Sequence, residues 1–416
     1  MNLLKQLYLT KGFKMYSFIY VTLSVLLLLF TTSIVLAETQ NSSTKLNFNS
    51  TNNSSNNKAT LYSGEKIKIL AGYPAIIKYL PGNKNKPLVV FVPGASHLAR
   101  ISYGYPGGNK KDFLEFWLHK EGYPFLAVSY PIENKVFSKV YPNFTITDWA
   151  DQITLASNFI IKKHHLSKNI VILAWSFAGY TAVKTNKLCK NQGLNVVLFI
   201  GLSADPPLRG LFKEPNNPIL PNIKMLPNGM VSPKPLNDWF DAWFINQLNM
   251  QDEINKHVII PKGIYQSKFI GNLPVALLGT QKRYNHGKFI NDINATLQDT
   301  QGFDYSNYPP IAVIYDTSYT DDDNAFFTPH DWSSIISRNV YYDILKKTKS
   351  NMTTGDTWRK ISDLVLRAPK KFTIAITPGN HFFFIGEIGA KRTALIIKSL
   401  IAERNAYNTS INKLAS

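Results

Sequence analysis

From about residue 60 onward, short apolar runs alternate with longer segments that are amphipathic at helical spacing. Short continuous apolar runs are typical of strands buried on both faces, and amphipathic segments between them are typical of covering helices. We expect strands at 88–92, 125–130, 170–173, 195–201, 311–315 and 372–376, after two leading strands within 59–79. We expect helices at 112–120, 149–165, 180–190 and 388–403. The alternation predicts an α/β fold with a mostly parallel, doubly wound sheet.

This alternation fails between residues 205 and 305, a stretch rich in proline and asparagine. One apparent helix there carries the aromatic residues Trp239, Phe240, Trp243 and Phe244. These rings could line an apolar pocket or could simply be core, and the pattern supports both interpretations equally.

The N-terminus has the pattern of an export signal. Three lysines and no acid precede an apolar run at 16–36, which ends in Val35-Leu36-Ala37. Cleavage after Ala37 is expected, although a run of about 20 apolar residues could also span a bilayer as an uncleaved anchor. The Asn/Ser-rich tract at 38–58 is expected to be a solvated linker. The protein is therefore predicted to be exported, either secreted or periplasmic, and membrane-anchored if residues 1–37 are retained.

Composition narrows the function classes. The 416 residues are 44% apolar, enough for a large core. The net charge of +19 comes from scattered lysines without an arginine-rich arm, so nucleic-acid binding is not predicted. A solvated basic surface is the favoured interpretation, and association with an anionic membrane surface is the alternative. Cys189 is the single cysteine, which excludes an intramolecular disulfide. Neither a paired-cysteine nor a His-Glu-x-x-His metal motif occurs, so no metal is expected.

The segment 170–179, IVILAWSFAG, is the most informative stretch. It predicts a buried strand that ends in Ser176 and turns at once into a helix, with small residues on both sides of the serine. Such a turn strains the serine backbone and exposes its hydroxyl. The segment resembles the nucleophile elbow of the α/β-hydrolase family, G-x-S-x-G, with Ala174 and Ala178 in place of the glycines. The order of elements resembles that family over roughly residues 60–405.

The resemblance implies that an acid and then a histidine follow the serine, each after a strand. His381 is the candidate general base, because it follows the late strand 372–376 in Thr377-Pro378-Gly379-Asn380-His381. The strand 311–315 is followed by four aspartates, and the family's usual spacing favours Asp321 or Asp322 as the acid, ahead of Asp316 and Asp323. Asp205, after an earlier strand, remains a rival. The aspartate run lacks the pattern of an EF-hand calcium loop.

An oxyanion hole needs backbone N–H groups aimed at the developing charge. The resemblance implies Phe177, directly after the nucleophile, and Ala95 in the turn Pro93-Gly94-Ala95-Ser96-His97. It also implies that residues 205–305 are a cap or lid inserted between the sixth and seventh strands of a core made of 59–204 and 306–416.

The resulting hypothesis is an exported serine esterase, lipase-like, that cleaves a small-molecule or lipid ester without a cofactor. Transfer to an alcohol or cleavage of a peptide would use the same groups. The alternative from a different class is a catalytically inactive secreted binding protein of the same fold, for which the altered elbow is the best support.

Overall fold

The computed structural model describes residues 61–137, 139–207, 224–232, 239–347 and 355–415. They belong to the unit formed by Asn57–Ser416. The predicted signal (1–37) and linker (38–58) lie outside the described residues. Among the helices that are described, none combines the length and the apolar character needed to cross a membrane.

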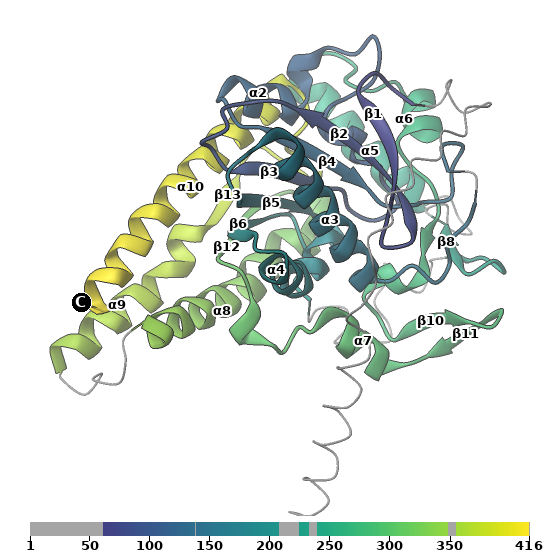
Figure 1. The fold of residues 1–416 in the computed structure, drawn as a ribbon. Coiled ribbons are helices and arrows are strands. Elements are labelled where there is room, and N and C mark those ends of the chain that lie inside the picture. Colours follow the sequence, from purple (N-terminus) through teal and green to yellow (C-terminus); the bar gives the residue numbers. More distant parts are fainter. Residues whose placement is uncertain (1–60, 138, 208–223, 233–238, 348–354, 416) are drawn as a thin grey trace, which may run out of the picture. The chain divides into compact units, whose positions relative to one another are not determined.

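An eight-stranded sheet forms the centre of this unit (Figure 1). Its strand order is β1-β2-β4-β3-β5-β6-β12-β13. The pairs β1–β2 and β2–β4 are antiparallel and the remaining pairs are parallel, so the mostly parallel α/β sheet is confirmed. The strands are β1 (Glu65–Leu70), β2 (Tyr73–Leu80), β3 (Leu88–Val92), β4 (Phe125–Ser129), β5 (Asn169–Trp175), β6 (Asn195–Leu202), β12 (Ile311–Asp316) and β13 (Thr373–Ile376).

The strand order reverses at β3, and this reversal positions the site. The chain leaves β3 through α2 (Leu114–Lys120) to β4, then returns through α3 (Ile146–His164) to β5 on the other side of β3. Right-handed crossovers in opposite directions place α2 and α3 on opposite faces of the sheet. Helix α10 (Glu387–Ala415) packs against α2, and α4 (Ala182–Asn191) packs against α3. The carboxyl ends of β3 and β5 therefore border the crevice where sheets of this kind bind ligands.

Several helix bounds differ from the prediction. Helix α3 begins at Ile146 rather than 149, because Thr145 and Asp148 form a capping box. After Ser176 the chain makes a 3-10 turn, η3 (Ser176–Thr181), before α4 begins. Helix α10 continues to Ala415 instead of ending at 403. Two long helices were not predicted, α8 (Asp322–Lys347) and α9 (Gly355–Phe372), which pack against each other.

The chain between β6 and β12 forms elements that are not part of the eight-stranded sheet. In the described part of this stretch, a small sheet and a hairpin accompany three helices and two short 3-10 turns. These are β7 (Lys224–Met225), β8 (Met230–Ser232), β9 (Leu273–Pro274), β10 (Lys282–Asn285), β11 (Lys288–Asn291), α5 (Trp239–Asn255), α6 (Lys262–Lys268), α7 (Ile293–Thr300), η5 (Val275–Leu278) and η6 (Tyr305–Asn307). Residues 208–223 and 233–238 of this stretch are outside the described part, and the role of 205–305 as a cap stays a prediction.

Candidate active site

Ser176 stands at the carboxyl end of β5 in a strained backbone. Its φ of +55° lies in the left-handed region, which non-glycine residues rarely adopt. The side chains of Ala174 and Ala178 are fully buried, while Ser176 is half-buried. Helix-type turns begin at the serine itself, in η3. These are the local features that the sequence of 170–179 predicted for an elbow.

The loop that follows β3 closes on this serine. A Cβ atom at Gly94 would lie 2.6 Å from the Cβ of Ser176, so only glycine permits the approach. The Tyr130 hydroxyl donates to the Gly94 carbonyl at 2.8 Å and braces the loop. Gly94 and Ser176 are followed in the sequence by Ala95 and Phe177, the two residues expected to supply oxyanion N–H groups.

The loop after β6 packs against the other side of the elbow. A Cβ at Gly179 would lie 2.1 Å from the Asp205 carbonyl oxygen, and the Asp205 N–H donates to the Ser176 carbonyl at 3.2 Å. The Asp205 carboxylate accepts a hydrogen bond from the Tyr180 hydroxyl at 2.9 Å. The rival acid Asp205 is therefore bonded to η3, while the His381 ring is bonded to Asp321.

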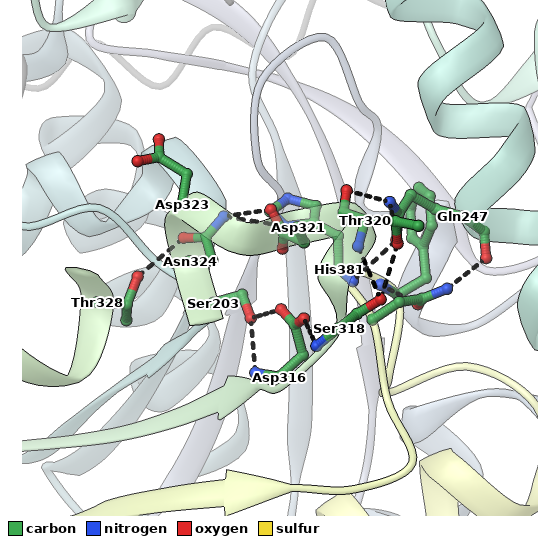
Figure 2. Close-up of polar contacts among 12 residues, drawn as sticks. Ser203, Gln247, Asp316, Ser318, Thr320, Asp321, Asp323, Asn324, Thr328 and His381 are labelled. Carbon is green, nitrogen blue, oxygen red and sulfur yellow. Dashed lines mark hydrogen bonds and ion pairs between the residues drawn. The ribbon is translucent and has the colours of Figure 1, made fainter. Parts of the chain in front are cut away.

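His381 and Asp321 form a buried hydrogen-bonded pair (Figure 2). Nδ1 of His381 lies 2.8 Å from Oδ2 of Asp321, and each side chain is 4% exposed. The amide of Asn324 donates to Oδ1 of Asp321 at 2.9 Å. Asp322, the other candidate acid, is exposed in the first turn of α8, where its carboxylate accepts the N–H of Asp323. The turn η7 (Tyr319–Asp321) is what points Asp321, and not Asp322, toward the histidine.

Electrostatics keeps Asp321 charged. Burial by itself would raise the pKa of Asp321, but the charge of His381 and hydrogen bonds from His381, Asp316 and Asn324 outweigh burial and hold this pKa below its ordinary value. A carboxylate in this position orients a histidine ring and stabilises its protonated form.

Asp316, at the end of β12, completes a cluster with this pair. It is fully buried, and one of its carboxyl oxygens lies within 4.8 Å of a carboxyl oxygen of Asp321 and of a ring nitrogen of His381. Burial raises the pKa of Asp316, and the neighbouring Asp321 raises it further, to about 9. Ser203 and the Ser318 N–H donate to its two oxygens, as Figure 2 shows.

Trp175, the last residue of β5 and the neighbour of Ser176, contacts His381. The Trp175 indole donates to the His381 carbonyl at 3.1 Å, and the two rings lie 5.3 Å apart. The hydrogen bonds among the described residues do not include one between the Ser176 hydroxyl and the His381 ring. Hydrogen bonds of this kind are often long without substrate and tighten when substrate binds.

Helix α5 holds the acid turn and the histidine loop together, which the sequence analysis missed. The Gln247 amide donates to the Thr320 carbonyl at 3.0 Å and its Oε1 accepts the His381 N–H at 3.2 Å (Figure 2). One turn later, Gln251 donates to Asn380 at 2.8 Å. Trp243, one of the four aromatic residues singled out in the sequence, also donates to Thr320. Two glutamines four positions apart in this aromatic-rich helix were the available signal.

Two further residues that the sequence singled out, His97 and Cys189, are buried. His97 is fully buried between the Ala95 carbonyl and the Tyr265 hydroxyl, each 2.6 Å away, and burial lowers its pKa to about 3, so its ring is neutral. Cys189 is buried in α4, and burial raises its pKa to about 11, which counts against a reactive thiolate.

No protein-family model matches the sequence, and no curated protein sequence is similar to it. Similar solved structures include a lipase-esterase related protein from Clostridium acetobutylicum, with 16% identity over 77% of this chain and 98% of the other, at a TM-score of 0.38. A thermophilic esterase from Thermogutta terrifontis has 11% identity over 82% and 98% of the two chains, at a TM-score of 0.41. An AqdC variant, solved with its substrate the Pseudomonas quinolone signal, has 12% identity over 82% and 99%, at 0.45. Since identities and TM-scores are this low, no residue role is transferred from these proteins.

Proposed function

We propose that this protein is a serine hydrolase of the α/β-hydrolase type that cleaves a carboxylic ester through an acyl-enzyme on Ser176. The observation that carries the proposal is the buried His381–Asp321 hydrogen bond of 2.8 Å. It lies at the carboxyl end of the sheet, the end at which the strained Ser176 follows β5. A histidine oriented by a carboxylate is what a serine hydroxyl needs to become a nucleophile.

The reaction divides between five groups. The Ser176 hydroxyl attacks the ester carbonyl while His381 accepts its proton, and Asp321 holds the ring and balances the imidazolium charge. The N–H groups of Phe177 and Ala95 stabilise the tetrahedral oxyanion, each by about 3 kcal/mol. His381 then protonates the leaving alcohol, and water attacks the acyl-enzyme with the same histidine as base.

A fluorophosphonate probe tests the nucleophile in the purified full-length protein. We expect labelling of the wild type, none of Ser176→Ala and strongly reduced labelling of His381→Ala. His330→Ala, which alters an exposed histidine on α8, is the matched control and should label normally. A folded wild type that does not label would reject the enzyme and favour the inactive binding protein.

A labelled enzyme can then be assayed with p-nitrophenyl esters of increasing acyl length, the corresponding anilides and an added alcohol. Hydrolysis of the esters alone supports the esterase. Faster cleavage of anilides would support a peptidase, and ester product formed with the alcohol would support an acyltransferase.

We also propose that the protein is exported and that its signal is cleaved after Ala37. The supporting observation is the basic start and apolar run of residues 1–37. Intact-mass analysis of protein from the exported fraction tests it. A mass beginning at Glu38 supports cleavage, and the full-length mass in a membrane fraction supports a signal anchor instead.

A further inference from the structure

Two buried carboxyl groups lie next to each other at the end of β12. A carboxyl oxygen of Asp316 and one of Asp321 lie within 4.8 Å of each other. Asp316 is fully buried and Asp321 is 5% exposed. Two carboxylates this close and this dry cannot both be ionised at modest cost, so one of the two holds a proton.

The partners of each carboxyl decide which one. Asp321 faces the His381 ring and the Asn324 amide, both donors that favour a charged acceptor. Asp316 accepts from the Ser203 hydroxyl at 2.8 Å and the Ser318 N–H at 3.0 Å, but these two bonds do not offset its complete burial, whereas the His381 ring is bonded to Asp321. The proton therefore belongs on Asp316.

The neighbouring elements supply no charge that would reverse this assignment. β6 and β13, the strands on either side of β12, contain no ionisable residue. The buried residues of α8 and α9, which also pack on β12, are uncharged. Among the described residues at this end of the sheet, the carboxyl and imidazole groups are Asp321 and His381, Asp322 and Asp323 at the start of α8, and Asp205, which accepts from Tyr180.

We propose that Asp316 is a positioning residue that keeps its proton at neutral pH and donates a hydrogen bond to Asp321, which stays charged and aligned toward His381. The role given to Asp321 rests on the function proposed above, while the location of the proton does not. The cluster then carries one negative charge, which a protonated His381 neutralises during the reaction.

Thermal unfolding across pH tests the proton without any substrate. A free aspartate ionises near pH 4, whereas the pKa of Asp316 in the folded protein is about 9. Between about pH 4 and about pH 9, unfolding therefore releases the Asp316 proton, and the wild type loses stability as pH rises through this range. Asp316→Asn keeps a donor to Asp321 and has no proton to release. Its Tm should therefore rise relative to the wild type from about pH 5 to about pH 9, whereas the exposed Asp322→Asn should show no such trend.

Parallel Tm curves for the wild type and Asp316→Asn would overturn the proposal. If Asp316→Asn does not fold, infrared spectra of the ¹³C-aspartate-labelled wild type replace it. A protonated aspartic acid C=O band at about pH 8 is expected, and its absence overturns the proposal. A Tm increase on adding Zn²⁺ or Ca²⁺ that Asp316→Asn abolishes would also overturn it, because the cluster would then be a cation site.

Fluorophosphonate labelling tests the positioning role separately. Asp316→Leu removes the donor and should label at least about tenfold more slowly, while Asp316→Asn should restore most of the rate. Equal rates for Leu and Asn would overturn the role of the hydrogen bond. A wild type that does not label would reject the proposed function, and the Tm comparison would still locate the proton.

Discussion

At the scale of single residues, the site depends on two glycines as much as on its polar groups. Gly94 and Gly179 allow the loops after β3 and β6 to approach the elbow within distances that a Cβ atom would prohibit. Left-handed backbone occurs at Ser176 and also at Ser96 and Ser203, one in each of these two loops. The alanines at 174 and 178 fit because both positions are fully buried without needing positive φ.

The adjacent aspartates Asp321 and Asp322 provide a matched pair of variants. Asp321→Asn leaves the His381 ring without its carboxylate and should lower the labelling rate by roughly 10³–10⁴-fold. Asp322→Asn, which alters an exposed side chain, should leave the rate nearly unchanged. An equal loss in both variants, or a loss in Asp322→Asn alone, would contradict the assignment of the acid.

At the scale of elements, α5 is bonded to both loops that carry the candidate acid and the candidate base. Its side chains reach the acid turn and the histidine loop, which are far apart in sequence, and hydrogen-bond both. A helix bonded to both loops fixes the distance between Asp321 and His381 from outside the sheet.

Replacement of Gln247 tests this bracing. Gln247→Ala removes the bonds to Thr320 and to the His381 N–H, and we expect labelling to slow by about 10–100-fold as the two loops lose register. The free energy of unfolding should fall by about 1–3 kcal/mol, because a buried N–H loses its partner. Asn249→Ala on the exposed face of the same helix is the control. If the two variants behave alike, α5 does not position the site.

At the scale of the whole described unit, a buried ion pair connects three segments. Arg100 and Glu65 meet through two hydrogen bonds of 2.8 and 2.7 Å, and both side chains are fully buried. Arg100 also donates to the Lys268 carbonyl at 2.9 Å. The edge strand β1, the turn η1 (Ala99–Ser102) and the end of α6 are thereby joined close to the Gly94–His97 loop.

Breaking this pair should destabilise the protein strongly. Arg100→Met leaves the buried Glu65 charge uncompensated and should lower the free energy of unfolding by about 3–5 kcal/mol in urea titrations. The double variant Arg100→Met/Glu65→Leu should recover much of this loss. Arg359→Met breaks an ion pair of 2.8 Å whose side chains are 77% exposed, and should change stability by less than about 1 kcal/mol. A small effect of Arg100→Met would show that the pair is not a determinant of stability.

Much of the fold follows from local pattern. The apolar runs at 88–92 and 311–315 determine strands because a segment with no polar face must be covered on both sides. The elbow at Ser176 was equally readable, since small side chains around a serine between a strand and a helix are a local signature. The helices α8 and α9 were missed, and each contains an internal proline, Pro329 and Pro369, a residue that normally interrupts a helical pattern.

The amino-acid sequence by itself determined the strands, the strained serine and the late histidine, because each depends on neighbours within about ten residues. Only the tertiary structure chose Asp321 over Asp322, assigned Asp316 to the same cluster and brought Gln247 to both loops. These choices depend on hydrogen bonds between residues that are far apart in the sequence, with separations of 60, 113 and 134 positions. A hydrogen bond over such a separation forms when the sheet closes, and burial, which shifts the pKa of each carboxyl, exists only in the folded chain.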